Sequence, residues 1–305
     1  MRVLLKKIKL FLIKSIHFFL LLVFPKKTIL KKGKLGVTTI IGHKHVYMFV
    51  FSFHSFLYFF KKKIACTVID DGTLREHDIT FIKANFPGIK IVLHKNANKE
   101  IYKKLLLYPN IKKYRKLKLI DKFNLKLTDP FLLSDYEKII YMDCDILFFR
   151  SPKEIISWTN KKYTQPLYIP ERPLKDKDTE PGEWSILNNI FKDYIKIPID
   201  SNFNSGLICI NREQLDLDLL EKSIKYTHKI KLEYTWTPEQ YALSTICAKH
   251  KAIALGKNYR HLIRKSDLTD SKKINYTLLH FAYLSKPLFW KYLLTLLLKT
   301  RFFNK

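Results

Sequence analysis

The chain has 305 residues, of which 47% are hydrophobic, and a formal net charge of +29. This apolar content is enough to bury a sizeable core, which excludes disorder throughout, and the length suits one α/β domain with appendages. No Asp or Glu occurs before Asp70 or after Asp270, so both ends are purely cationic. Such ends suit an anionic membrane surface or a nucleic acid.

The cysteines are scattered, with no C-x-x-C pair and no metal-ligand spacing. This argues against a structural zinc site formed by them and favours a reducing, cytoplasmic compartment. The four are Cys66, Cys144, Cys209 and Cys247.

Residues 1–33 form a basic, apolar N-terminal segment. Its apolar stretch from Leu10 to Phe24 contains Lys14 and His17. At about 15 residues it is shorter than a bilayer-crossing helix of roughly 20, and no small-residue cleavage site follows it. The segment is therefore predicted to lie on the membrane surface. An uncleaved anchor and a helix packed on the core are the alternatives.

The middle of the chain, residues 34–288, alternates strand-like and helix-like segments. This order predicts an α/β fold whose central sheet is mainly parallel and flanked by helices. Residues 170–184 are predicted to form a long loop of the kind that often covers a site. Strands are expected at 36–41, 63–69 and 90–94, and helices at 47–60, 75–85 and 114–127.

Two aspartates, Asp143 and Asp145, follow an apolar run that begins at Ile139. If the run continues as an extended strand, both carboxylates project to the same side, about two residue rises apart. Such a pair can share a hard divalent cation, at the strand end where open α/β sheets bind ligands. The alternative is a strand that stops and turns, with Asp as a turn former.

Two further polar elements follow. Asn204 offers a donor and an acceptor in a turn before an apolar strand, and Gly206 lets a ligand approach the backbone. Glu239 and Gln240 begin an apolar helix after Thr237, which indicates a capping box in which Gln240 reaches back to Thr237. Each element alone is also explained as ordinary turn or cap structure.

His280 ends another apolar run, and Lys286 follows six residues later. A neutral imidazole can complete the coordination of Mn²⁺ beside two carboxylates, and a lysine can hold a phosphate. Residues 289–305 then mix aromatic, aliphatic and cationic residues without an acid, which is typical of an interfacial helix. An amphipathic helix docked on the core is the alternative for this tail.

Taken together, these elements resemble those of the family 8 glycosyltransferases and their bacterial relatives, which have the GT-A fold and use nucleotide-diphosphate sugars. The resemblance covers roughly residues 37–287. The matching elements are Tyr136 to Leu147 with the family's YLDxD strand, Tyr114 to Leu119 with its preceding basic helix, Phe203 to Ile208 with FNsGvmli, Glu239-Gln240 with its acidic-Gln pair, and His280 to Pro287 with HfxGxxKPW.

The resemblance implies that Asp143, Asp145 and His280 hold Mn²⁺ or Mg²⁺, with Lys286 on the diphosphate of a UDP-sugar. It also implies a GT-A fold and retention at the anomeric carbon. The basic, apolar ends, rather than the resemblance, point to the acceptor: they suit a saccharide or a lipid-linked saccharide, such as a lipopolysaccharide or capsule precursor, reached from the membrane surface.

Further roles follow from the same resemblance. It places Asn204, Gln240 and Glu239 beside the donor sugar, and Gly206 in the donor pocket. Lys116 or Lys118 is expected to be the basic residue that contacts the sugar or phosphate, and Asp71 is the candidate nucleotide contact.

The chain departs from the family pattern in its first strand, which lacks the usual acidic nucleotide-contacting signature, and at three single positions. Tyr283 replaces the glycine of the closing motif, Leu288 its tryptophan, and Glu239 the usual aspartate. These departures keep open a second hypothesis, a protein that binds a nucleotide sugar without turnover.

Two unrelated functions are disfavoured. Specific nucleic-acid binding is not supported, because no helix-turn-helix, zinc-finger or RRM-type signature is present. A haloacid-dehalogenase-type phosphatase is excluded because Ile69 occupies the position of the nucleophilic aspartate.

Overall fold

The computed structural model describes residues 30, 33–119, 122–161, 165–171, 194–197, 199–200, 202–232, 234, 237–263 and 275–299. Most of the N-terminal segment, the end of the C-terminal tail and nearly all of the predicted 170–184 loop lie outside these ranges. In the described part of the chain, no helix has the length and apolarity needed to cross a bilayer.

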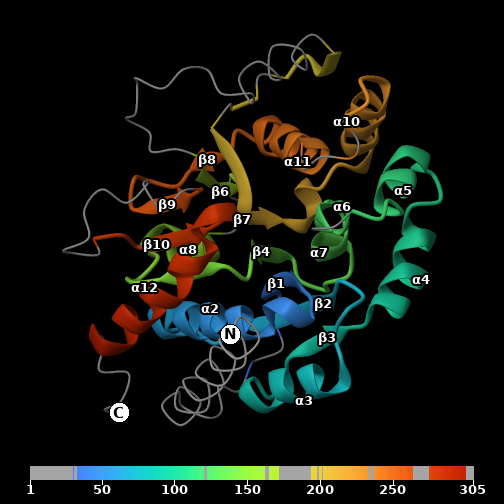
Figure 1. The fold of residues 1–305 in the computed structure, drawn as a ribbon. Helices are drawn as coiled ribbons and strands as arrows, with labels where there is room; N and C mark the ends of the chain where they lie inside the picture. The colour runs from blue at the N-terminus through green and yellow to red at the C-terminus, as the bar shows by residue number, and fades with distance from the viewer. Residues whose placement is uncertain are drawn as a thin grey trace, which may run out of the picture.

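A seven-stranded sheet forms the centre of the molecule (Figure 1). Six strands run in the same direction and β7 runs against them, which confirms the predicted mainly parallel sheet. The order is β3-β2-β1-β4-β7-β6-β8, with bounds β1 Leu35–Ile41, β2 Ala65–Asp70, β3 Lys90–Val92, β4 Lys138–Met142, β6 Leu167–Pro170, β7 Phe203–Asn211 and β8 Ile253–Ala254.

A second, three-stranded sheet adjoins the first in the order β5-β10-β9. Its strands are β5 Ile146–Phe148, β9 Tyr259–Leu262 and β10 Leu278–Phe281. Strand β10 pairs antiparallel with β5 and parallel with β9. The chain therefore passes from the large sheet to the small one between β4 and β5.

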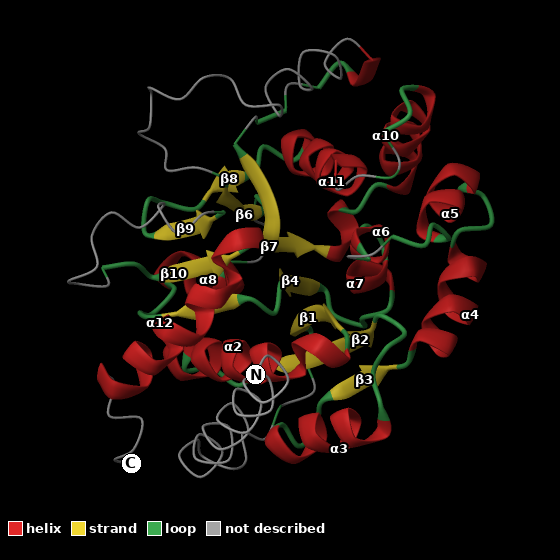
Figure 2. Ribbon diagram, viewed as in Figure 1, coloured by secondary structure: helices red, strands yellow, loops and turns green. Residues whose placement is uncertain are grey.

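Helices cover both faces of the large sheet (Figure 2). They are α2 Val46–Phe60, α3 Glu76–Asn85, α4 His94–Lys104, α5 Pro109–Arg115, α6 Phe123–Lys126, α7 Asp129–Leu132, α8 Lys153–Asn160, α10 Leu217–Lys229, α11 Thr237–Lys249 and α12 Lys286–Lys299, with short 3₁₀ turns η1 His43–His45, η2 Arg212–Gln214 and η4 Tyr283–Ser285.

The core has two sides because successive strand residues face opposite ways. In β4, Ile140 and Met142 pack with α2 and α8, whereas Ile139 and Tyr141 pack with α4, α5, α7, α10 and α11. Burial of both faces explains why the strands read as continuous apolar runs in the sequence.

The predicted helix over 114–127 is wrong. Helix α5 ends at Arg115, and two short helices follow. Asn124 Nδ2 donates to the backbone carbonyls of Arg115 (2.6 Å) and Leu117 (2.9 Å), which satisfies groups that a continuous helix would have paired internally. The chain can therefore turn here without leaving buried carbonyls unpaired.

Helix α12 crosses the boundary predicted between residues 288 and 289. One face, with Phe289, Leu293 and Leu297, is buried in a cluster that also contains Phe51 of α2 and Leu147 of β5. This part of the predicted tail is therefore docked on the core, next to α2 (Figure 1).

Candidate active site

The two aspartates lie in the turn that joins the two sheets. Strand β4 ends at Met142, so the expectation of one extended strand through both aspartates is wrong. The Asp143 N–H donates to the carbonyl of Gly206 (2.8 Å), and the Phe281 N–H donates to the carbonyl of Asp145 (2.9 Å). These bonds tie the turn to β7 on one side and to β10 on the other.

Asp143, Asp145 and His280 converge on one point. His280 Nε2 lies 3.1 Å from Asp145 Oδ1 and 3.6 Å from Asp143 Oδ2. One ligand atom from each residue lies within 4.8 Å of the others. Asp145 Oδ1 is buried and makes no hydrogen bond within the described residues. Two carboxylates and one imidazole with an unsatisfied buried oxygen fit a divalent cation such as Mn²⁺ or Mg²⁺.

Two lysines lie beside these carboxylates. Lys286 Nζ is 3.6 Å from Asp145 Oδ2, and Lys126 Nζ is 2.9 Å from Asp143 Oδ2. Lys126 is 8% exposed. Burial lowers its pKa, but Asp143 and Glu239 act more strongly together, so the pKa is raised and the ammonium stays charged.

Lys126, and not Lys116 or Lys118, is the lysine that contacts Asp143 in the described structure. Lys116 Nζ instead lies over the ring of Tyr102, 5.3 Å from its centroid. No contact in the described structure joins Lys116 or Lys118 to the aspartates. No local sequence signal marks Lys126, because it is one of many lysines and lies in an apolar stretch.

Asp143 is held from both sides. The Tyr141 hydroxyl donates to its Oδ1, and Lys126 pairs with its Oδ2. The Lys126 ammonium also lies over the Tyr141 ring, 5.1 Å from its centroid. This arrangement fixes the direction of the carboxylate before any ligand binds.

Neighbouring side chains control the charge of Asp145. Burial by itself raises the pKa of Asp145, but His280, Lys286 and Lys126 outweigh burial, so the pKa lies below its usual range. The carboxylate is therefore charged in the folded protein at neutral pH, as a metal ligand must be.

Gly206 makes room for His280. A Cβ added at Gly206 would lie 2.2 Å from His280 Cε1 and 2.5 Å from His280 Nδ1. The imidazole thus occupies the space that the sequence interpretation left for a ligand, and the glycine lets His280 reach the aspartates.

Asn204 is fixed by its neighbours. Its Nδ2 donates to Glu171 Oε2 (2.8 Å), and its Oδ1 accepts from the Gly206 N–H (2.9 Å). Glu171 in turn lies 3.3 Å from His261 Nδ1, and the His261 ring lies 4.7 Å from the His280 ring. Glu171 and His261 were not predicted, because strand pairing brings them here: β9 with β10 for His261, and β6 with β7 for Glu171.

Gln240 bonds to β7. Its Oε1 accepts from the N–H and the hydroxyl of Ser205, both at 3.3 Å. Glu239 is 2% exposed, and burial raises its pKa to about 7, although Lys126 and the Ser205 hydroxyl lower it. Both residues therefore face β7 beside the aspartates.

Two other residues singled out in the sequence lie in turns. Asp71 closes the turn after β2, where its Oδ1 accepts from the N–H (2.9 Å) and hydroxyl (2.6 Å) of Thr73. Tyr283 takes a left-handed backbone conformation (φ 51°), which a glycine adopts more readily, and its side chain is 76% exposed. The turn before Lys286 thus forms with its aromatic side chain directed outward.

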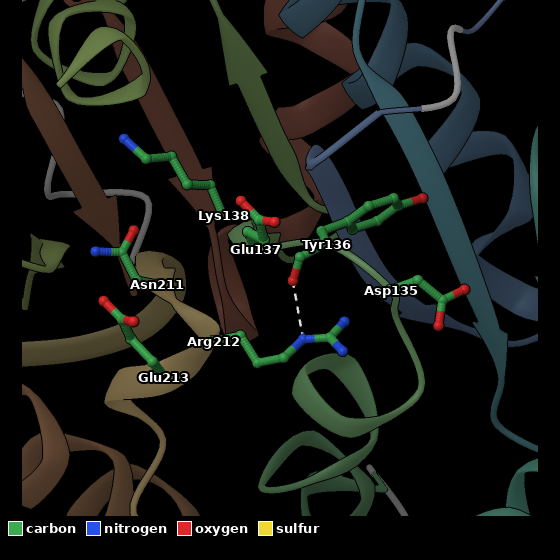
Figure 3. Close-up of a pocket in the computed structure, with 7 residues that line it drawn as sticks. All are labelled: Asp135, Tyr136, Glu137, Lys138, Asn211, Arg212 and Glu213. Carbon is green, nitrogen blue, oxygen red and sulfur yellow. Dashed lines mark hydrogen bonds between the residues drawn. The ribbon is translucent and has the colours of Figure 1, made fainter. Parts of the chain in front are cut away.

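A surface hollow of about 430 Å³ lies at the opposite end of β4 from Asp143. Figure 3 shows the side chains that line it and the bond from Arg212 Nε to the carbonyl of Tyr136. Because Lys138 at its edge begins β4 and Asp143 follows the end of that strand, this hollow is separate from the aspartate site.

No protein-family model matches the chain, and no curated protein matches its sequence. Solved structures do match. Mouse xyloside xylosyltransferase 1, in its apo form, aligns with a TM-score of 0.53 and 13% identity over 82% of this chain and 98% of that chain.

Two further matches are glycosyltransferases by their names. The galactosyltransferase LgtC with donor and acceptor sugar analogues aligns with a TM-score of 0.50 and 12% identity, over 86% of this chain and 96% of that chain. The bifunctional glycosyltransferase WbbM aligns with a TM-score of 0.54 and 10% identity, over 88% and 50%. The chain therefore has the mixed α/β fold of the GT-A glycosyltransferases.

Proposed function

We propose that this protein is a metal-dependent glycosyltransferase that moves a sugar from a nucleotide-diphosphate donor, a UDP-sugar, to a saccharide or lipid-linked acceptor. One observation carries the proposal. The GT-A fold brings Asp143, Asp145 and His280 together from positions more than a hundred residues apart, with Lys286 beside them. The sequence resemblance to family 8 supports the finer assignment, including retention.

The residues present suit the demands of the reaction. Breaking the bond between sugar and diphosphate develops negative charge on the leaving phosphate oxygen. A bound Mn²⁺ or Mg²⁺ would supply Lewis-acid stabilisation of that charge. Lys286, whose side chain is 44% exposed, can turn from Asp145 towards a phosphate and add a second positive charge.

The sugar end of the donor is assigned to residues on the β7 side of the aspartates. Lys126 is charged and buried beside Asp143 and can donate to a sugar hydroxyl. Asn204, Glu239 and Gln240 offer oxygens to the positive character that develops on the sugar. Because Asn204 and Gln240 are already held by Glu171 and Ser205, they need little reordering on binding.

The proposed membrane location, and with it the lipid-linked acceptor, is inferred from the exposed surface of α12. Its outward face and the preceding turn expose Tyr283 (76%), Leu284 (60%), Trp290 (38%) and Leu294 (55%), with Lys291 between them. The chain contains no acid after Asp270. Aromatic, aliphatic and cationic side chains on one helix face suit an anionic bilayer surface. Lys286, beside Asp145, is the first residue of this helix. A peripheral position would bring a lipid-linked acceptor to the site.

The test is release of UDP from a panel of UDP-sugars in the presence of Mn²⁺. We expect turnover that EDTA abolishes, and a loss of at least a hundredfold in Asp145→Asn, because one metal ligand and its charge are removed. Asp135→Asn is the matched control and should retain activity, because this carboxylate is exposed and lies just before β4, at the opposite end of the strand from Asp143. Binding of UDP-sugars without turnover would favour the non-catalytic hypothesis, and absence of both binding and turnover would overturn the proposal.

A further inference from the structure

A second group of nitrogen and oxygen donors lies at the carboxyl ends of β1 and β2, apart from the aspartate site. His43 follows β1 in η1, and His77 and Asp78 lie in the first turn of α3. His43 Nδ1 is 2.8 Å from Asp78 Oδ2, and His77 Nε2 is 3.2 Å from Asp78 Oδ1. A donor atom from each residue lies within 4.8 Å of the other two.

We propose that His43, His77 and Asp78 form a second cation site that binds Zn²⁺ or a similar transition metal. Ligand atoms at about 2.0 Å from a tetrahedral zinc lie on the order of 3.3 Å from one another. The separations of His43 from Asp78 Oδ2 (2.8 Å) and of His77 from the other carboxylate oxygen, Oδ1 (3.2 Å), are within about half an ångström of this value. Water would complete the coordination, because the site is open to solvent on the His77 side, where the side chain is 65% exposed.

The donor set selects a different metal from that of the aspartate site. Two imidazoles and one carboxylate favour Zn²⁺ over Mg²⁺ and Mn²⁺, which prefer oxygen ligands. Asp143, Asp145 and His280 have the opposite ratio of oxygen to nitrogen. The two sites should therefore be distinguishable by the ion that each retains.

The backbone around the ligands is ordered by contacts of the protein itself. The His43 N–H donates to Thr73 Oγ1 (2.9 Å), and the Arg75 N–H donates to Asp78 Oδ2 (2.9 Å). A Cβ at Gly42 would lie 2.1 Å from Asp71 Oδ2, so the turn that carries His43 packs tightly on the turn after β2. Little further ordering is needed when an ion binds, which favours affinity.

Ion binding requires a lone pair on each imidazole nitrogen that faces Asp78. Without the ion, an ionised carboxylate can only accept, so His43 Nδ1 donates its N–H to Asp78 Oδ2 (2.8 Å). With the ion, that nitrogen presents its lone pair and the proton lies on the other ring nitrogen. The ion would then connect the end of β1 to α3 and stabilise the folded chain by mass action.

The experiment uses the full chain with Asp143→Asn and Asp145→Asn, so that the aspartate site is silent. Titration with ZnCl₂ by calorimetry should show one ion bound per chain. His77→Asn in this background should weaken zinc binding at least tenfold. Because the His77 side chain is exposed, this substitution should leave the fold intact, so weaker binding reports the loss of a ligand. His250→Asn is the matched control, because His250 lies outside the group and contacts the carbonyl of Gln214 (3.0 Å).

A second measurement identifies the ligands directly. Replacement of zinc by Co²⁺ should give the visible absorption of a tetrahedral site, and this absorption should disappear in His43→Asn and in His77→Asn. Zinc affinity unchanged in both histidine variants, or no zinc bound by the double aspartate variant, would overturn the proposal. Neither result bears on the transferase proposal, which is tested by UDP release.

Discussion

At the residue scale, the site depends on how closely side chains can approach one another. Gly206 lies against the His280 ring, Tyr141 and Lys126 hold Asp143 from two sides, and Glu239 is buried beside them. Each contact serves geometry or charge at the aspartates. Two single substitutions test these two properties separately.

Gly206→Ala should displace His280. The added Cβ would lie 2.2 Å from His280 Cε1, so the ring must move away from the aspartates. We expect at least tenfold weaker Mn²⁺ binding and a loss of about 1–3 kcal/mol in the free energy of unfolding. Calorimetry and urea denaturation measure the two effects.

Gly36→Ala is the matched control for steric strain. Its Cβ would lie 2.1 Å from the Tyr136 ring, at the opposite end of β4 from Asp143. This variant should lose stability but keep its Mn²⁺ affinity. Equal loss of affinity in both variants would contradict a specific role for Gly206.

Glu239 should make stability depend on pH. Burial raises its pKa from the usual 4.5 to about 7 in the folded chain. Its contribution to stability is therefore complete below about pH 4.5 and is lost as pH rises through about 7, by roughly 3 kcal/mol in total. Glu239→Gln, which remains neutral, should lack this fall.

The measurement is urea denaturation in EDTA from about pH 5 to about pH 8, the range over which the two proteins should diverge. The difference in free energy of unfolding between wild type and Glu239→Gln should change steadily with pH. Parallel curves would show that Glu239 titrates near its usual pKa.

At the element scale, the segment between α5 and α7 places Lys126 in the site. A buried pair fixes this segment, since Arg115 Nε and Nη2 donate to Asp129 Oδ1 (2.8 Å) and Oδ2 (2.7 Å). The two side chains are 1% and 0% exposed. Removal of one partner therefore leaves a buried charge uncompensated.

Asp129→Asn should lower the free energy of unfolding by about 3–5 kcal/mol. The double variant Arg115→Met with Asp129→Leu should recover much of this loss, because no buried charge remains. Chemical denaturation of the three proteins gives the comparison. A small effect of Asp129→Asn would mean that water or Asn98, which accepts from Arg115 Nη1 (2.7 Å), compensates the guanidinium.

At the scale of the whole molecule, charge and exposed apolar surface favour attachment to an anionic bilayer. The full chain should sediment with vesicles of phosphatidylglycerol and phosphatidylcholine, and added salt should weaken this binding. Leu294→Glu should reduce the bound fraction about tenfold, because it places a charge on the exposed face of α12.

Leu107→Glu is the control for this prediction. Leu107 is 84% exposed after α4, on a different part of the surface. Equal partitioning of Leu294→Glu and the wild-type protein would exclude the α12 face as the contact surface.

The sequence by itself determined the type of fold and much of the site. Apolar runs of strand length alternate with helical segments, and this pattern specified the mainly parallel sheet. Local periodicity reports which faces of a segment are buried, and a continuous apolar run indicates a strand buried on both faces. The residue types and order of Asp143, Asp145 and His280 pointed to a cation site. The structure brings these three together.

Only the tertiary structure decided which other residues join them. The turn at Asp143, the role of Gly206 beside His280, and the arrival of Lys126, Glu171 and His261 depend on contacts between segments distant in the sequence. The local sequence around a lysine or histidine does not show whether its side chain lies on the surface or in a functional site. Strand pairing and the irregular α5 to α7 segment distinguish them, because these decide which side chains share a buried space.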